Sequence, residues 1–288
     1  MSTLSGFPPQ PGVASYNYRD NFWSASPSDF NMFLMEILKG NVSGYTYELV
    51  AGHLDNVGTA RADVWDEGGA YVYPSDSGTT MTISSSSVND TSAGSGAQTV
   101  TVWGLDANWG AVTETATMNG KTAVNLVNTY SRINKLCVAT AGASGWNEGN
   151  IYIGAQSDTL TNGKPNTNVY ARIIFDSIGA TSFGENCTLS SLRSIPSDKT
   201  AFILSPSFYS NGAKDIETWV YSRLFGSVFI VDDRMMKRNA PLVPPESFMF
   251  TLPAKSDIAF RAAASASTDV AITYGLILVD TDSGVLNQ

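Results

Sequence analysis

The side chains that most often carry out chemistry are sparse in this chain of 288 residues. The only histidine is His53, and its neighbours form no recognisable motif. A serine or cysteine hydrolase of the usual kind needs a base beside its nucleophile, and histidine usually supplies it. The glycine–serine stretches at 94–96 and 142–145 lack the spacing of a nucleophile elbow and are expected to be loops. We therefore expect no enzymatic activity, and no catalytic residue is assigned.

Paired carboxylates are the remaining route to catalysis, because a glycosidase can bring two acids together from distant positions. The candidate acids are Asp63, Asp66, Glu67, Asp76, Asp232 and Asp233. The first three surround Trp65, an arrangement that could bind a sugar or calcium. A solvated acidic turn is the more frequent structure for such a segment. The segment 232–238 has the composition of a mixed-charge loop, in which individual ion pairs contribute little.

Metal and cofactor motifs are missing from the sequence. It has no phosphate-binding loop, no dinucleotide fingerprint, no zinc-protease helix and no EF-hand loop, so we expect no cofactor and assign no metal ligand. The possibility of bound calcium stays open. The two cysteines, Cys137 and Cys187, fit neither a disulfide framework nor a four-ligand zinc site, and we expect buried free thiols.

The net charge of the chain limits the classes of partner that it is expected to bind. With 17 Lys and Arg against 26 Asp and Glu, the formal net charge is −9, which argues against a nucleic-acid partner. No apolar run approaches the roughly twenty residues that a bilayer span needs, so no membrane partner is expected. The first residues lack a basic stretch followed by an apolar one, which predicts synthesis in the cytoplasm.

One helix is expected near residues 27–39. Ser26 can cap it, Pro27 suits its first position, and Gly40 can end it. The apolar positions recur with helical spacing, and they are Phe30, Phe33, Leu34, Ile37 and Leu38. This spacing predicts one buried face, packed on the protein's own sheet or on a second surface.

Most of the remaining chain has the period of β-strands. Residues 98–105 and 112–118 alternate apolar side chains with threonine and predict a hairpin closed by the loop 106–110. Short strands separated by Gly, Asn and Asp turns recur to residue 279, and only 15% of residues are charged. We predict an all-β fold, an antiparallel β-sandwich of jelly-roll type, with one domain over 26–288.

Residues 1–25 are predicted to form an extended N-terminal arm, because prolines and aromatic residues alternate there without regular periodicity. A segment with so many aromatic residues is expected to pack on its own domain or on a neighbour. Two tryptophans in loops are either contact tips or packing at the edge of the sandwich. The predicted partner-contact residues are Phe7, Pro8, Pro9, Tyr16, Tyr18, Trp23, Trp109 and Trp146.

Several segments carry a resemblance to a known group of proteins. The chain reads N-D-T-S-A-G-S-G-A-Q-T-V-T-V-W-G-L-D at 89–106 and E-T-A-T-M-N-G at 114–120. Further matching stretches lie at 132–142, 147–153, 252–262 and 276–280. These segments resemble ones that recur in virion structural proteins of tailed bacteriophages, marine and cyanobacterial phages included. In the first of them, Asn89, Asp90, Gly94 and Gly96 are expected to supply turns, including positive φ angles.

This resemblance implies a β-rich, non-enzymatic protein located in the virion. The first expectation is a capsid decoration (cement) protein that binds the major capsid protein, stabilises the shell and forms a homo-oligomer, a trimer by preference. The alternative is a neck or tail adaptor, fibre or receptor-binding component that contacts neck or tail proteins. A carbohydrate-binding or glycan-cleaving virion protein is the distant alternative.

Overall fold

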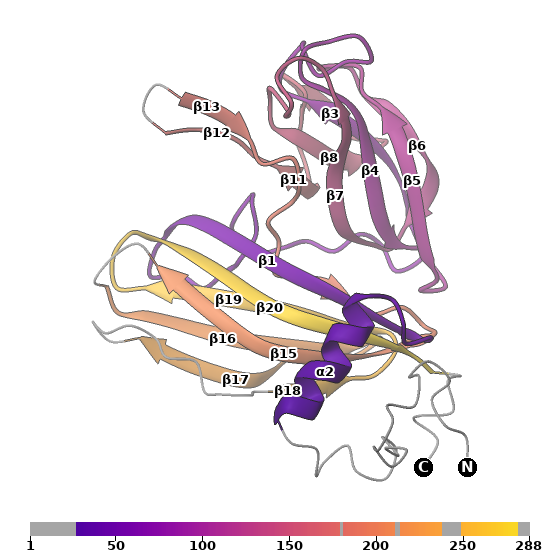
Figure 1. Cartoon of the computed structure of the whole chain (residues 1–288). Coiled ribbons are helices and arrows are strands. Elements are labelled where there is room, and N and C mark those ends of the chain that lie inside the picture. The colour runs from indigo at the N-terminus through magenta and orange to yellow at the C-terminus, as the bar shows by residue number, and fades with distance from the viewer. Residues whose placement is uncertain (1–26, 179–180, 211–213, 238–248, 282–288) are drawn as a thin grey trace.

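The computed structural model describes residues 27–178, 181–210, 214–237 and 249–281. The predicted arm, and with it the contacts predicted for Phe7, Pro8, Pro9, Tyr16, Tyr18 and Trp23, lies outside these residues. Figure 1 shows two lobes made almost entirely of strands, with one helix against the lower lobe.

The helix is confirmed as α2, Pro27–Leu38. Gly40 follows it with a φ of 74°, which is the left-handed cap that glycine adopts without strain. Its buried side chains Phe33 and Ile37 pack with Leu204 and Ile277 on the outer face of a sheet. Packing on the protein's own sheet is therefore observed, while Met32 and Met35 remain exposed.

The lower lobe, called here the flanking lobe, contains two antiparallel sheets around one core. The first sheet has the order β1 (Tyr45–Val57), β20 (Thr268–Asp280), β15 (Lys199–Ser210) and β18 (Met249–Leu252). The second has the order β14 (Arg193–Ser194), β19 (Ser256–Ala264), β16 (Ile216–Leu224) and β17 (Ile230–Lys237), and β2 (Ala62–Asp63) pairs with β19. Their facing side chains, among them Val50, Ile203, Val220, Phe260 and Ile272, form a fully buried core.

The upper lobe, called the inserted lobe, contains the strands between β2 and β14. One sheet has the order β11 (Val169–Ile173), β8 (Ile151–Ala155), β3 (Thr79–Ser85) and β6 (Val124–Tyr130). The other has the order β5 (Ala111–Thr117), β4 (Ala97–Leu105) and β7 (Arg132–Ala141). The short pairs are β9 (Leu160–Thr161) with β10 (Lys164–Pro165), and β12 (Phe175–Ile178) with β13 (Thr181–Gly184). Met81, Val100, Leu136 and Ile153 lie in a second, separate core.

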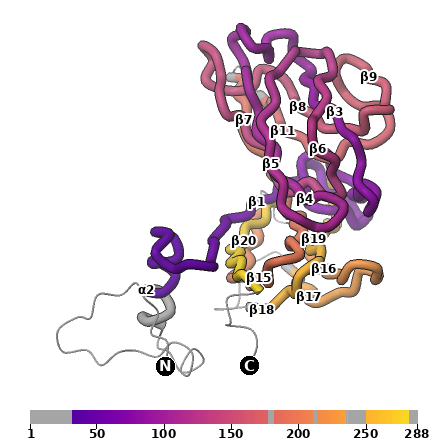
Figure 2. The backbone as a smooth tube through the Cα atoms, turned by 90° about the vertical axis from the view of Figure 1, so that its right-hand side faces the viewer, coloured from indigo at the N-terminus to yellow at the C-terminus, as the bar shows by residue number. Residues whose placement is uncertain are grey.

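The all-β, antiparallel prediction is confirmed, and so is the hairpin of β4 and β5 around the loop 106–110. The jelly-roll assignment is not confirmed by these strand orders. The structure also differs from the predicted single sandwich over 26–288, because two cores are present and one lobe interrupts the other. Strand periodicity is a local signal that does not reveal which strands share a core. Figure 2 shows the two lobes stacked along the vertical direction.

A buried ion cluster joins the lobes. Arg132 at the start of β7 donates to Asp257 on β19 from Nε at 2.9 Å and from Nη2 at 3.1 Å. Arg223 on β16 donates to the same carboxylate at 2.7 Å, and the Ser194 hydroxyl also donates to it. Arg132 is 2% exposed and Asp257 is fully buried. The Arg132 guanidinium lies 4.5 Å from the ring centre of Trp109, so the cation is covered by an aromatic face.

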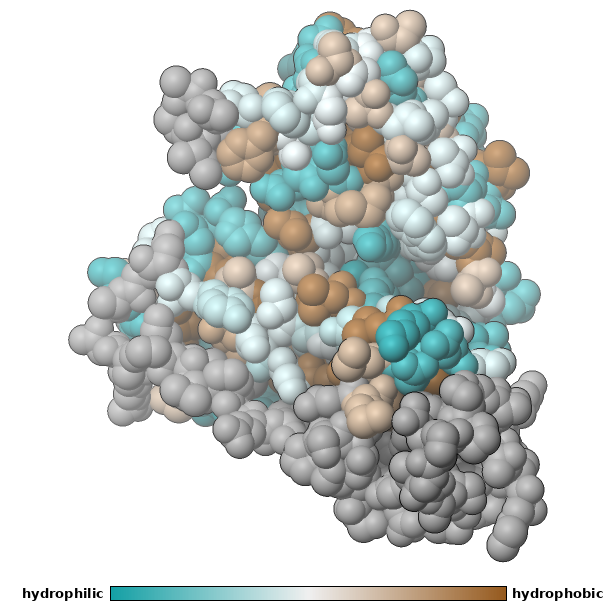
Figure 3. Space-filling view, in the orientation of Figure 1, coloured by the Kyte–Doolittle hydropathy of each residue, from teal (hydrophilic) through white to brown (hydrophobic). Residues whose placement is uncertain are grey.

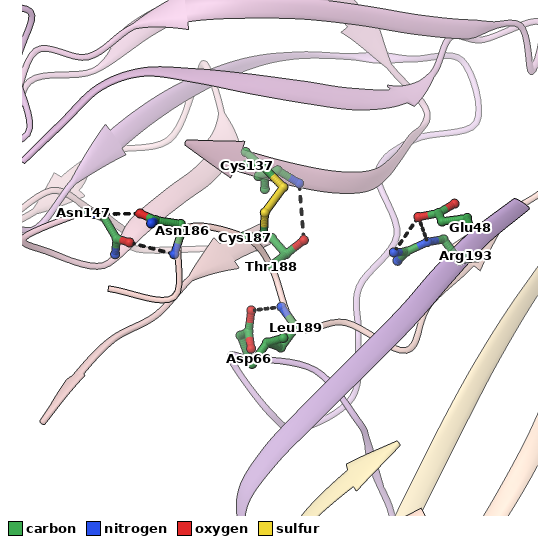
Figure 4. Close-up of a disulfide and its surroundings, with 10 residues drawn as sticks. Glu48, Asp66, Cys137, Asn147, Asn186, Cys187, Thr188, Leu189 and Arg193 are labelled. Carbon is green, nitrogen blue, oxygen red and sulfur yellow. Dashed lines mark hydrogen bonds and ion pairs between the residues drawn. A yellow bond between two sulfur atoms is a disulfide. The ribbon is translucent and has the colours of Figure 1, made fainter. Parts of the chain in front are cut away.

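The cysteine prediction is wrong: Cys137 and Cys187 form a disulfide. Cys137 lies on β7, and Cys187 lies in the segment 185–193 that leads back to the flanking lobe, called here the return strap (Figure 4). An isolated antiparallel bridge places the two residues opposite each other, with their Cα atoms 4.1 Å apart. They are 50 positions apart in the sequence, so their spacing carried no signal of the pairing.

Replacing both cysteines by serine is expected to destabilise the protein. Without the cross-link the unfolded chain regains the entropy of an open loop of this length, about 4 kcal/mol in the chain-entropy model. Denaturant unfolding should show a free energy of unfolding lower by roughly 2–5 kcal/mol. Dithiothreitol should produce a comparable loss in the parent protein and none in the double variant. Equal stability of parent and double variant would contradict a structural role for the bond.

Candidate functional site

The motif that carries the resemblance forms a hydrogen-bonded cluster around Asp90. Its Oδ1 accepts from the backbone N–H of Ala97 at 2.7 Å and of Glu148 at 2.9 Å. Its Oδ2 accepts from Gly149 N–H at 3.0 Å and from the Ser85 hydroxyl at 2.5 Å. Four donors satisfy a carboxylate that is fully buried. Asp90 therefore fixes the loops 84–96 and 145–150 to each other.

The glycines of this motif are required for close approach. A Cβ at Gly96 would lie 2.1 Å from Asp90 Oδ1, and one at Gly94 would lie 1.9 Å from the carbonyl oxygen of Asn89. The positive φ angles predicted for Gly94 and Gly96 are not observed, whereas Gly120 at the end of the motif has a φ of 60°. The predicted positive φ angles were therefore wrong for Gly94 and Gly96. Glycine is needed at these positions because neighbouring atoms leave no room for a Cβ, and not because of a turn conformation.

Glu114, from the second part of the motif, closes the edge of the inserted lobe between β5 and β6. Its carboxylate accepts from the backbone N–H of Val127 at 2.7 Å and of Asn128 at 3.2 Å. The Tyr130 hydroxyl donates to it at 2.6 Å. The carboxylate thus occupies backbone donors of β6 that have no strand partner there, and such donors are otherwise open to pairing with another chain. The motif has a scaffold role in every contact that the structure shows.

The predicted solvated acidic turn at 63–67 is wrong. Asp63 is 1% exposed, accepts from Arg261 Nε at 2.7 Å and accepts from the Tyr71 N–H at 2.7 Å. Glu67 forms ion pairs with Lys164 and Arg172. The alternation of acidic and apolar residues in this segment could have indicated that the acids are buried. Their basic partners could not have been predicted, because they come from strands that are distant in sequence. These acids connect parts of the fold.

Asp66 is buried with a single bond to its carboxylate, from Leu189 N–H to Oδ2 at 2.7 Å (Figure 4). Burial raises the pKa of Asp66 well above its ordinary value, because a charged carboxylate loses its hydration there, while the Leu189 bond and Arg172 act in the opposite direction. The remaining candidates do not join this group. Asp76 pairs with Arg132, and Asp232 and Asp233 lie on β17, where a loop was predicted.

The described part of the chain shows neither a clustered metal-ion site nor a membrane-spanning helix. Within residues 27–178, 181–210, 214–237 and 249–281, no three His, Cys, Asp or Glu side chains gather as a possible ion site. No helix in these same parts of the chain has the length and apolar character to cross a membrane. His53 is half-exposed, and its Nε2 lies 3.6 Å from Asp55 Oδ1.

The two loop tryptophans have different environments. Trp109 is 1% exposed and packs against Arg132 and, with ring centres 5.5 Å apart, against Phe225. It cannot serve as a contact tip, so the packing alternative describes it. Trp146 is 38% exposed on a loop held by Asn147 and Asn186, whose side chains bond to each other's backbone N–H groups. A contact role for Trp146 stays a prediction.

A surface that sequence reasoning missed is the hairpin joining β16 and β17. It exposes five apolar side chains within eight residues, and they are Leu224, Phe225, Val228, Ile230 and Val231, each 49–77% exposed. Gly226, with a φ of 76°, makes the turn. Figure 2 shows this loop projecting from the flanking lobe. On the face shown in Figure 3, by contrast, apolar and polar side chains are interspersed.

The signal for this surface was present as an apolar run interrupted only by Gly226 and Ser227. Hairpin turns are usually polar, so an apolar one exposes more apolar surface than the fold needs. Of the five side chains, Phe225 also packs on Trp109. β17 is also the last strand of its sheet. Its middle carries Asp232, Asp233 and Arg234, and charges of this kind discourage edge-to-edge pairing. The hairpin tip is therefore the part of this edge best suited to a protein contact.

Comparison with known proteins returns little. No protein-family model matches the chain, and the search of curated proteins found no match. Among solved structures, the chain is similar to one described as the structure of infectious bursal disease virus Gt strain, at 9% identity and a TM-score of 0.20. That alignment covers 87% of this chain and 78% of the other. The Gx strain structure gives 9% identity and a TM-score of 0.16, with coverages of 82% and 77%. Such low TM-scores carry no argument, so function must be inferred from this chain's own residues.

Replacing Gly96 by alanine is expected to destabilise the inserted lobe, because the new Cβ displaces the Asp90 carboxylate from its four donors. Hydrogen bonds to a charged group contribute about 1.5–3 kcal/mol each, so the free energy of unfolding should fall by at least about 2 kcal/mol. Gly58→Ala is the matched control, since no atom lies within 4 Å of its Cβ position. Urea unfolding of both variants measures the difference, and equal effects would disprove the close-contact explanation.

Asp66→Asn is expected to change how stability depends on pH. Because the folded-state pKa of Asp66 is raised, its contribution is fully present below the unfolded pKa, near 3.9, and is lost as pH rises through the folded value. The asparagine variant lacks this loss, so its stability relative to the parent should increase with pH and then level off. Denaturant unfolding at a series of pH values between about 4 and 8 measures this difference. A constant difference across the series would be inconsistent with the raised pKa.

Proposed function

We propose that this chain is a non-enzymatic structural protein of a tailed-bacteriophage virion, synthesised and assembled in the host cytoplasm. Its preferred role is that of a capsid decoration (cement) protein that binds the major capsid protein and stabilises the shell. Two observations support the proposal: the resemblance of residues 80–155 and 220–281 to phage virion proteins, and the scaffold role that Asp90 and Glu114 have within that resemblance.

The observation that carries a docking role is the exposed β16–β17 hairpin. Burial of one large apolar side chain on binding contributes about 1.5–3 kcal/mol, and this loop exposes five such side chains. The apolar tip at 224–231 contains no charged side chain, and Asp232, Asp233 and Arg234 follow it on β17. A contact limited to the tip therefore leaves no ion unpaired. We propose a symmetric homo-oligomer, a trimer by preference, because several hairpins on one particle would then act together and increase the apparent affinity.

The non-enzymatic part of the proposal rests on what the acidic side chains do. Asp63 is bonded to Arg261, and Asp257 is bonded to Arg132 and Arg223. A glycosidase acid must reach a substrate, and these two carboxylates are 1% exposed or less. Each is engaged in holding strands together.

A neck or tail role is the second candidate, and Trp146 favours it. The indole is exposed on a loop that Asn147 and Asn186 hold in place, and a rigid exposed aromatic side chain suits a binding hot spot. In this role the inserted lobe would contact the receptor or the next tail protein, and the hairpin would attach the chain to the particle.

Particle binding tests the proposal with matched variants. Val228→Lys combined with Ile230→Lys should weaken binding to phage particles that lack this protein by at least about 100-fold, because two apolar contacts are lost. Val127→Lys combined with Val88→Lys places the same two new charges on the inserted lobe, where these side chains are 92% and 65% exposed, and should bind as the parent does. Co-sedimentation gives the affinities, and thermal unfolding confirms that the variants fold.

Electron microscopy of the same particles separates the two roles. Density or gold label distributed over the whole head supports a decoration protein, whereas label confined to the neck or tail supports the alternative. A parent protein that binds no part of the particle would overturn both roles.

A further inference from the structure

A small cavity lies between the lobes and is unrelated to the hairpin. Trp65 and Asp66 line it from the segment after β2, Tyr170 and Arg172 line it from β11, and Lys135 lines it from β7. Ser190 of the return strap completes one wall. The cavity therefore lies between the inserted lobe, the segment that follows β2 and the return strap.

Three polar atoms of the side chains that line this cavity are buried and have no hydrogen-bond partner: Asp66 Oδ1, Trp65 Nε1 and Arg172 Nε. Asp66 is 8% exposed and Trp65 is 4% exposed. Buried polar groups in native proteins are almost always satisfied by protein or by ordered water. Three such atoms around one cavity point to a missing common partner.

The chemistry of the three atoms selects that partner. Trp65 Nε1 and Arg172 Nε are N–H donors, so their partner must accept hydrogen bonds. Asp66 Oδ1 is an acceptor when the carboxylate is ionised, so the same partner must also donate. A metal cation would leave the two N–H groups unsatisfied. Water accepts two hydrogen bonds and donates two, and it satisfies all three atoms at once.

The size of the cavity agrees with a single molecule. The centre of a water molecule can occupy about 10 Å³ there, close to the ~10–15 Å³ that one bound water requires. A larger solute does not fit this space. We propose that one structural water is bound between Trp65, Asp66 and Arg172 and joins the segment after β2 to β11 of the inserted lobe.

Direct bonds surround the proposed site on both sides. Arg172 Nη1 donates to the Asp66 carbonyl oxygen at 3.0 Å, and Leu189 N–H donates to Asp66 Oδ2 at 2.7 Å. The water completes this set by joining the remaining donors to the free carboxylate oxygen.

A high-resolution crystal structure of the full chain tests the site directly. The expected result is one ordered density peak within hydrogen-bond distance of Asp66 Oδ1, Trp65 Nε1 and Arg172 Nε. An empty cavity, or a peak that a metal ion alone explains, would overturn the proposal. This outcome is independent of the virion role, because it does not depend on binding to any particle.

Solution NMR provides a second measurement and a matched control. The indole N–H proton of Trp65 should show magnetisation transfer from a long-lived bound water, and that of Trp146, which is exposed, should not. Trp65→Phe removes one donor while keeping an aromatic ring, and it should lower the water occupancy seen in crystals of the variant. Trp146→Phe should leave that occupancy unchanged. If the indole protons of Trp65 and Trp146 behave alike, the proposal is wrong.

Discussion

The arrangement of the two lobes depends on the burial of one charge pair. Arg132 and Asp257 come from different lobes, and neither has access to enough water to be stable alone. Removing one partner of a buried pair typically costs about 3–5 kcal/mol, because the other charge is left uncompensated. Arg223 and Ser194 share the Asp257 carboxylate, so separating the lobes would break several bonds together. The pair therefore ties the relative position of the lobes to one shared set of polar contacts.

The inserted lobe is organised by the same principle on a smaller scale. Asp90 and Glu114 are carboxylates that accept backbone N–H groups from loops or from an edge strand. Each replaces strand pairing that the local chain geometry cannot supply. In both places the fold itself accounts for the residues of the motif. The surfaces proposed to recognise partners lie elsewhere, in the hairpin and in the loop of Trp146.

Local features of the fold were predictable from the sequence, and long-range ones were not. The helix at 27–38 and the hairpin of β4 and β5 follow from spacing, capping and turn residues within a dozen positions. The pairing of Cys137 with Cys187 and of Asp63 with Arg261 depends on strands that are distant in sequence. The exposed hairpin was missed for another reason, since an apolar run predicts burial unless the neighbouring strands are known. Trp109 shows the converse, because its loop position suggested exposure.

The return strap also determines how the molecule would carry a mechanical load. Within 185–193, Cys187 forms the disulfide with Cys137 on β7, and the Leu189 N–H donates a hydrogen bond to Asp66. Arg193 forms an ion pair with Glu48 on β1. Cys187 attaches the strap to the inserted lobe and Arg193 attaches it to the flanking lobe, so a force that pulls the lobes apart passes through both attachments in series. Under such a load the disulfide would keep the strap joined to the inserted lobe after the ion pair at Arg193 has opened.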